Sequence, residues 1–281
     1  MTDISASLVK ELRDETNVGM MECKRALVEA QGDKAKAVTI LRERGIAIAH
    51  KKSSRAANQG VIASALLEDS RVGSLIEVNC ETDFVAKNEK FKAFVQTLAE
   101  RAAGAELNLA EAAATEITAK IAEIGENIVV RRNLRYAVQE TGRVAAYIHH
   151  GSTIGVLLEA ACQKTETTEN PVFQELIKDL CLHIAASNPG YIDRQGVPAD
   201  IIAAEREIYA KQIVGKPANI IGKIVDGKIN KFFEQVCLVD QPFVKEQDKH
   251  VSVLLKEKGA LLNDSVSVRR FARFQLGDKL A

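Results

Sequence analysis

The chain has 281 residues, of which 46% are hydrophobic and 27% charged, and its 38 basic side chains equal its 38 acidic ones. This composition is typical of a globular protein of one to three domains with a full core. The formal net charge of zero argues against a protein that binds nucleic acid by broad phosphate neutralisation, and an aromatic content of 5% without tryptophan leaves few surfaces on which bases could stack. A protein partner is therefore favoured.

The five cysteines are scattered along the chain at Cys23, Cys80, Cys162, Cys181 and Cys237. None belongs to a Cys-x-x-Cys pair and no histidine stands at zinc-ligand spacing from them, so we predict buried thiols and neither a metal site nor a cofactor. The N-terminus does not resemble a signal peptide, and no segment approaches the roughly 18 apolar residues of a membrane span. We expect a cytoplasmic protein without a membrane contact.

Residues 1–50 are predicted to form three short helices. Gly32 is expected to end the second helix, Asp33 to cap the third, and Gly45 to close it. A bundle of this size is marginal alone, so it is expected to dock on something. The polar and small residues 51–59 are interpreted as a linker.

Residues 60–105 recur at 142–187 without a gap, at a constant offset of 82. Eleven of the 46 aligned positions are identical, which predicts a duplicated structural unit. Identical pairs include Gly60 with Gly142, Glu77 with Glu159, Cys80 with Cys162, and Asn88 with Asn170.

Each copy is predicted to form two strands, a helix and a later strand, which gives an α+β fold with core subdomains at residues 60–140 and 141–281. The later strand carries Arg131 and Arg132 in the first copy and Arg269 and Arg270 in the second, at an offset of 138. Because the arginine pair recurs, we interpret it as part of the scaffold or as a surface pair.

The difference between the two offsets, 138 − 82 = 56, predicts an insertion in the second copy at about residues 188–240. Its pattern indicates a helical hairpin, with Pro198 and Pro217 in first helical turns and Gly215 breaking the first helix. The isoleucine-rich stripe of this hairpin is either covered within the hairpin or shared with a second subunit, as in a homodimer.

The two copies stop agreeing directly after the shared cysteine. The first copy reads Thr82, Asp83, Phe84 and Val85, whereas residues 164–167 of the second read Lys, Thr, Glu and Thr. Thr82 or Asp83 is expected to cap the following helix, and Phe84 would then be a hydrophobic staple. The loss of the aromatic from the second copy favours another interpretation, in which Asp83 and Phe84 form an exposed loop tip that joins a charge able to act on metal or phosphate to an apolar wedge.

Two other segments are predicted to make contacts and not to carry out catalysis. His149 and His150 lie at a predicted hairpin, where neighbouring strand residues point to opposite faces, so a contact surface is favoured over a metal or general-base site. Met20 and Met21 open a helix, and the one that remains outside the core suits an adaptable contact. No nucleotide-binding or catalytic sequence motif is present, and no catalytic residue is predicted.

Two segments carry a family resemblance. Residues 16–27, Thr-Asn-Val-Gly-Met-Met-Glu-Cys-Lys-Arg-Ala-Leu, and residues 77–86, Glu-Val-Asn-Cys-Glu-Thr-Asp-Phe-Val-Ala, resemble the two signatures of the translation elongation factor Ts family. The resemblance implies a guanine-nucleotide exchange factor for elongation factor Tu, bound in its GDP and nucleotide-free forms. It also implies a ubiquitin-associated-like N-terminal bundle and a coiled-coil form of the inserted hairpin.

The family's site residues carry over position by position. The resemblance implies that the segment that disturbs Mg²⁺ and phosphate in the partner is Thr82, Asp83, Phe84 and Val85. It implies partner contacts for the N-terminal bundle and the hairpin at Met20, Met21, Cys23 and Lys24, and at His149 or His150, between which the sequence does not choose. A C-terminal helical module found in some members is not expected, since the chain ends soon after its last predicted strand. The competing interpretation is a non-catalytic adaptor that uses the bundle and the hairpin for protein contacts.

Overall fold

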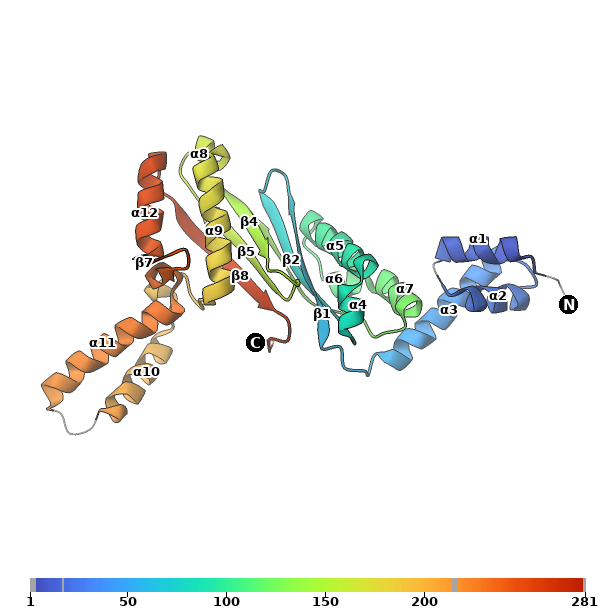
Figure 1. Cartoon of the computed structure of the whole chain (residues 1–281), viewed down its shortest axis with the longest axis horizontal. Helices are drawn as coiled ribbons and strands as arrows, with labels where there is room; N and C mark the ends of the chain where they lie inside the picture. Colours follow the sequence, from blue (N-terminus) through green and yellow to red (C-terminus); the bar gives the residue numbers. More distant parts are fainter. Residues whose placement is uncertain (1–3, 17, 214–216, 280–281) are drawn as a thin grey trace. The chain divides into compact units, whose positions relative to one another are not determined.

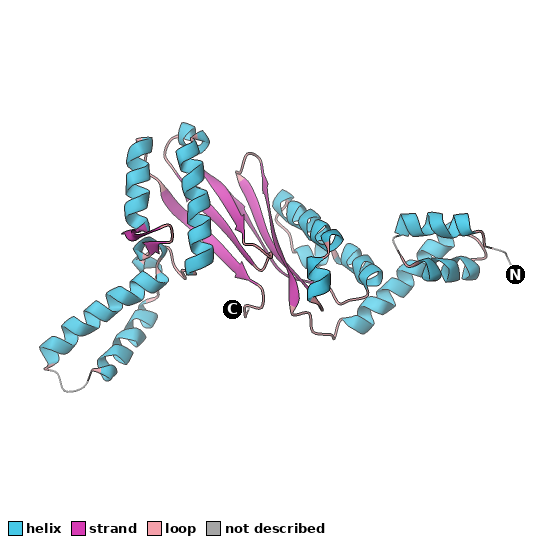
Figure 2. Cartoon of the chain, viewed as in Figure 1, coloured by secondary structure: helices cyan, strands magenta, loops and turns pink. Residues whose placement is uncertain are grey.

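The computed structural model describes residues 4–16, 18–213 and 217–279, so Asn17, within the first of the two resembling segments, and Gly215, expected to break the first hairpin helix, lie outside the described residues. The fold is α+β, as predicted, with helices beside small sheets (Figures 1 and 2). It divides into two compact units, the first made of Met1–Ala63, Ile76–Leu134 and Leu276–Ala281, and the second of Ser64–Leu75 and Arg135–Gln275.

The first unit begins with a three-helix bundle made of α1 (Ala6–Thr16), α2 (Met20–Glu29) and α3 (Lys34–Lys52). The bundle has its own buried core of Val9, Leu12, Cys23, Ala26, Leu27, Ala30, Ala37 and Leu41. The Asp33 carboxylate accepts the Lys36 N–H at 3.0 Å, which confirms the predicted cap of the third helix.

The prediction that Gly45 closes this helix is wrong, because α3 continues for seven more residues to Lys52. Gly45 is buried, and a Cβ built on it would lie 3.4 Å from the Ala122 Cβ of α7 (Ala114–Ile124). The missing side chain therefore lets two helices approach closely. The Lys52 ammonium also contacts the Gly125 carbonyl at the end of α7.

The two copies contain matching strands. In the first copy the sheet order is β1 (Gln59–Leu67), β2 (Val72–Cys80), β3 (Val129–Ala137). In the second it is β4 (Gly142–Ile148), β5 (Ile154–Ala161), β8 (Ser267–Gln275), and both pairings of this second sheet are antiparallel. The predicted duplication of strands is therefore confirmed.

The helices that follow β2 and β5 begin at positions related by the offset of 82. In the first copy they are α4 (Asp83–Lys87) and α5 (Glu89–Gly104), and in the second α8 (Thr165–Glu169) and α9 (Pro171–Ser187). The shared Asn88 and Asn170 cap α5 and α9, since each side chain accepts a backbone N–H of the following turn. The units are completed by α6 (Leu109–Ala112) and α7 in the first copy and by α12 (Val251–Leu262) in the second.

Identical residues in the two copies also have identical surroundings. A Cβ on Gly60 would lie 2.4 Å from the Val78 carbonyl oxygen, and one on Gly142 would lie 2.2 Å from that of Ala160. Because backbone atoms cannot yield as side chains do, both positions require glycine.

The shared glutamates are buried against the arginine pairs. The Arg132 Nε donates to Glu77 at 2.7 Å, and the Arg270 Nε donates to Glu159 at 2.7 Å. A register shift at Glu159 leaves Arg269 without a strand partner in the β5–β8 pairing, so both adjacent arginines reach one carboxylate instead of pointing to opposite faces. The arginine pairs thus belong to the scaffold, and Arg270 is exposed at the surface as well.

The insertion is a helical hairpin, as predicted, with α10 (Ala199–Gln212) and α11 (Ala218–Val236) (Figure 1). Short elements border it: η1 (Arg194–Gly196), η2 (Leu238–Asp240), β6 (Pro242–Phe243) and β7 (Glu246–His250). Part of its apolar stripe is covered internally, around a cluster of Val197, Val225, Ile229, Phe233 and Cys237. Another part, formed by Ile201, Ile208 and Ile220, is exposed.

Candidate functional site

The segment that differs between the copies is a turn between strand β2 and helix α4. Thr82 has an extended backbone and is the N-cap of α4, and its hydroxyl oxygen accepts the Val85 N–H at 3.4 Å. Of the two expected caps, Thr82 is confirmed, and the helix begins at Asp83. The cap directs the first turn of α4, which carries the candidate residues.

Phe84 is 82% exposed, so it does not form the hydrophobic staple that would have explained it structurally. Beside it, the Asp83 carboxylate accepts a hydrogen bond from the Lys87 ammonium at 2.6 Å, one helical turn away. This hydrogen bond holds the pKa of Asp83 below its usual value, so the carboxylate is ionised at neutral pH. The turn therefore presents an aromatic ring and a negative charge to solvent.

A carboxylate from a distant part of the first unit holds this turn. Glu126 Oε2 accepts the N–H groups of Glu81 and Thr82, both at 3.0 Å, and its Oε1 accepts the Thr82 hydroxyl at 2.6 Å. In return, Glu81 Oε1 accepts the Asn127 N–H at 2.6 Å. The two segments, about 45 residues apart, are thereby joined in both directions.

The same arrangement exists in the second copy. Asp264 accepts the N–H groups of Gln163 and Lys164, both at 3.0 Å, and the Thr167 hydroxyl at 2.6 Å. The offset of 138 that relates the arginine pairs also relates Glu126 to Asp264. Sequence reasoning missed both acids, although extending that alignment a few residues toward the N-terminus would have paired them.

The predicted contact residues of the bundle lie on α2. Met20 and Met21 are 47% and 66% exposed, and Lys24 is exposed as well. A surface hollow of about 480 Å³ beside them is lined by Met21, Lys24, Arg25, Val28, Glu29 and Arg44. The exposed thioethers lie next to basic and acidic side chains, and their flexibility suits an adaptable contact.

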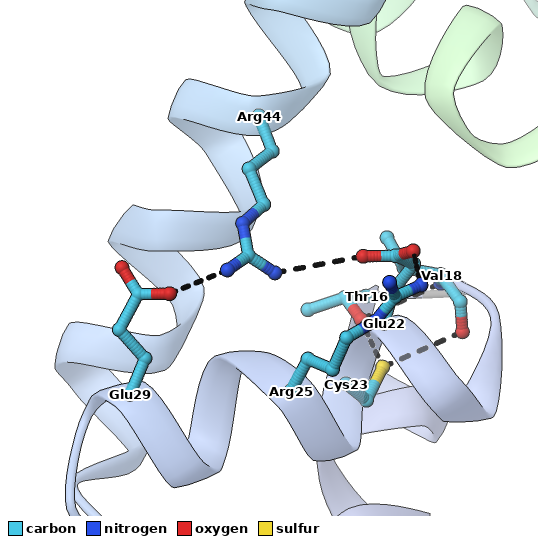
Figure 3. A network of polar contacts seen from close by, with 7 residues as sticks. All are labelled: Thr16, Val18, Glu22, Cys23, Arg25, Glu29 and Arg44. Carbon is cyan, nitrogen blue, oxygen red and sulfur yellow. Dashed lines mark hydrogen bonds and ion pairs between the residues drawn. The ribbon is translucent and has the colours of Figure 1, made fainter.

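Cys23 has a different environment from its neighbours, because its side chain is completely buried. Its thiol donates to the Val18 carbonyl at 3.5 Å and lies 3.8 Å from the Thr16 hydroxyl (Figure 3). Cys23 thus joins the turn before α2 to the bundle core. It would support a partner contact by stabilising α2 and not through its own side chain.

Arg44 fixes this helix on its neighbour. From α3, its guanidinium reaches Glu29 and also donates to Glu22 at 3.5 Å, and Glu22 contacts Arg25 within α2 (Figure 3). Because these side chains are partly exposed, their ion pairs contribute orientation more than stability.

The two histidines belong to the second unit, after β4. His149 is exposed, its Nδ1 lies 3.0 Å from the Tyr147 hydroxyl, and its backbone N–H donates to the Ile154 carbonyl. His150 is exposed at the turn that Gly151 makes with a φ of +86°. The ring of His149 is thus held in place by a neighbouring side chain.

The cysteines are all free and buried. Burial and then the charge of Glu126 raise the pKa of Cys80 to about 12, so this thiol is protonated at neutral pH and unsuited to nucleophilic attack. It donates instead to the Thr82 carbonyl at 3.2 Å, and Cys162 does the same to Lys164 in the second copy.

Residues 4–16, 18–213 and 217–279 contain no cluster of three or more His, Cys, Asp or Glu side chains arranged to hold a metal ion. Within the same ranges, every helix is too short or too polar to cross a bilayer.

The chain is similar to known proteins of one family. The family model described as elongation factor TS matches residues 81–278. Curated relatives named elongation factor Ts include that of Clostridium perfringens, 43% identical over 98% of this chain and 93% of the relative, and that of a Nitratiruptor species, 44% identical over the same shares. The relative of Trichlorobacter lovleyi is 40% identical over 99% of this chain and 94% of its own.

The fold and these matches define a translation elongation factor, a protein of the protein-synthesis machinery. The chain belongs to the elongation factor Ts family.

Proposed function

We propose that the protein is the guanine-nucleotide exchange factor of elongation factor Tu, and that it promotes GDP release by inserting residues 82–85 beside the nucleotide and Mg²⁺ of its partner. The observation that carries this proposal is the exposure of Phe84 on a turn whose twin in the second copy has no aromatic residue. An 82% exposed phenylalanine has little packing to contribute to folding, so a use in contact with a partner accounts for it better.

The chemistry required is displacement rather than covalent catalysis, so the protein would not be an enzyme. Phe84 would enter the partner as an apolar wedge, and the ionised Asp83 would disturb the electrostatics of the Mg²⁺ and phosphate site of the partner. If the protein weakens GDP binding in its partner, GDP must weaken the binding of the protein by the same factor. The protein would consequently bind both the GDP-bound and the nucleotide-free partner, and would bind the latter more tightly.

Other surfaces would supply affinity. We assign the first contact to Met20, Met21 and Lys24, with Cys23 supporting them from the core of the bundle. A second contact would come from the hairpin of His149 and His150. The bond from Tyr147 to His149 favours this ring as the ordered contact, since a held side chain loses less entropy on binding.

Further features fit the setting of protein synthesis in the cytoplasm. The balanced charge supports a protein partner over direct contact with nucleic acid. Ile201, Ile208 and Ile220 of the inserted hairpin are exposed. They would form the contact surface of a homodimer. An adaptor without exchange activity would use the same bundle and hairpin but would not need the wedge.

The test is release of fluorescently labelled GDP from elongation factor Tu, with and without the full chain. The chain should accelerate release, and Phe84→Ala should remove most of that acceleration while changing the free energy of unfolding by less than about 1 kcal/mol. Phe91→Ala is the matched control for packing, because Phe91 is fully buried and its loss should cost about 3–5 kcal/mol.

No acceleration by the wild-type chain, together with tight binding, would favour the adaptor. A large fall in the melting temperature of Phe84→Ala would instead show that Phe84 stabilises the fold.

A further inference from the structure

We infer that Glu126 is the positioning residue of the exchange segment: its carboxylate holds the turn from which Asp83 and Phe84 project, and it thereby sets the rate of nucleotide release. This inference rests on the proposed exchange function and adds a residue outside the segment itself. Glu126 lies more than forty positions later in the chain, after helix α7.

A path of hydrogen bonds connects Glu126 to α4. Its two oxygens accept the Glu81 and Thr82 N–H groups at 3.0 Å and the Thr82 hydroxyl at 2.6 Å. The same hydroxyl oxygen accepts the Val85 N–H of the first helical turn. The direction of α4 is therefore connected to one carboxylate through a single threonine side chain.

Apart from the backbone of this turn, little orients the Phe84 side chain. Its ring is 82% exposed, and no residue of α4 is buried. The position of the ring therefore depends on the backbone of the turn. A group that must enter a partner at a defined place loses affinity for the transition state when its support is loose.

The residues on either side of Glu126 hold it in place. Helix α7 ends at Ile124, and the C-cap Gly125, with a φ of +81°, turns the chain back toward β2. The Asn127 N–H donates to Glu81, and the Asn127 side-chain amide donates to the Arg55 carbonyl at 2.8 Å. The Glu126 carboxylate is therefore attached to a fixed segment of backbone.

The second copy distinguishes the positioning role of Glu126 from a role in folding. Asp264 makes the equivalent three bonds in the second copy, after the left-handed Asn263 that ends α12. There the bonded segment carries no aromatic residue, and its buried Thr167 supplies the hydroxyl. The shared bonds therefore stabilise both turns, but only the turn held by Glu126 carries a wedge.

The experiment compares Glu126→Gln with Asp264→Asn in the full chain. Each variant replaces a carboxylate by an amide of nearly equal size that can accept at one oxygen only. Labelled-GDP release from elongation factor Tu is measured over a range of chain concentrations, and thermal unfolding of each variant is recorded alongside.

We expect similar falls in melting temperature for the two variants. Only Glu126→Gln should lower the maximal rate of GDP release, by about tenfold, because misplacement of a supported group costs one to two orders of magnitude in rate. The concentration of chain that gives half-maximal release should change less than about threefold, since the other contacts are intact.

Two further variants make the result specific. Glu126→Asp keeps the charge and should recover part of the rate. In the double variant Glu126→Gln with Phe84→Ala, release should be no slower than with Phe84→Ala alone, because Glu126 acts through the segment.

Equal loss of rate in Glu126→Gln and Asp264→Asn would overturn the inference, as would additive losses in the double variant. A higher half-maximal concentration with an unchanged maximal rate would also overturn it, since Glu126 would then be a direct contact. These outcomes are distinct from failure of the proposed function, in which the wild-type chain itself would not accelerate release.

Discussion

Among single residues, His183 shows how a buried polar group connects the inserted hairpin to the core. The Val244 N–H donates to its Nδ1 at 3.2 Å, so the ring proton lies on Nε2 and is donated to the Gln241 side-chain oxygen at 2.9 Å. The Gln241 amide donates in turn to the Gln235 carbonyl of α11 at 2.7 Å. Only the neutral imidazole satisfies this chain of bonds, because a proton on Nδ1 would face the Val244 N–H.

This arrangement predicts a pH dependence of stability. Burial lowers the pKa of His183, and the hydrogen bond to Gln241 offsets only part of that shift. As the pH falls below about 6.5, the usual histidine value, the unfolded chain binds a proton at this position that the folded chain does not. The free energy of unfolding should therefore decrease, with a slope of up to about 1.4 kcal/mol per pH unit from this group.

Urea unfolding at several pH values between about 7 and 5 measures the effect across the range in which histidine titrates. His183→Gln should be less stable at neutral pH and should show a shallower slope, whereas His149→Gln, altered at an exposed ring, should keep the wild-type slope. An unchanged slope in His183→Gln would assign the acid sensitivity to other groups.

At the scale of elements, the duplication made most of the core predictable, because strands, helices and caps recur at constant offsets. Asn88 and Asn170 could be paired from the sequence, and both proved to be caps. Glu126 was not found: the offset of 138 pairs it with Asp264, but nothing in the sequence shows that its carboxylate accepts backbone N–H groups about 45 residues away. Gly45 was misinterpreted because glycine ends helices more often than it permits their close packing.

The duplication also predicts the result of a transplant. Replacing residues 82–85 by their second-copy counterparts, through Thr82→Lys, Asp83→Thr, Phe84→Glu and Val85→Thr, should preserve the fold. The threonine introduced at position 85 corresponds to Thr167, whose hydroxyl bonds Asp264, so Glu126 would keep a hydroxyl donor.

The transplanted chain should keep the circular dichroism spectrum of the wild type and part of its affinity for elongation factor Tu, measured by titration. Its acceleration of labelled-GDP release should be nearly lost, because neither the carboxylate nor the aromatic ring remains at the tip. A folded, binding and fully active chain would place the origin of exchange elsewhere.

For the whole molecule, the central question is how independent the N-terminal bundle is. Its core consists only of residues from α1, α2, α3 and the turn between the last two, which supports independent folding. Its last helix nevertheless packs against α7, with Gly45 beside Ala122 and Lys52 on the Gly125 carbonyl. The sequence predicted that the bundle docks on another element, but the extension of α3 beyond Gly45, which makes this contact, was not foreseen.

Deletion of residues 1–50 should leave a folded core with a melting temperature a few degrees lower, since one helix contact is lost and the larger buried clusters remain. The dissociation constant for elongation factor Tu should rise at least about tenfold, because removing one contact surface of roughly 1.4 kcal/mol has that effect. Calorimetry and a binding titration measure the two quantities, and an unchanged affinity would exclude the bundle from the interface.

The paired acids Glu126 and Asp264 have a consequence for how such a protein can change over time. From the turn that it holds, each accepts two backbone N–H groups, which any sequence but proline supplies, and one hydroxyl, which comes from the N-cap in one copy and from the third helical residue in the other. The support therefore tolerates different four-residue tips. Natural variation or design can consequently replace the side chains that this turn presents, while the surrounding architecture is inherited unchanged.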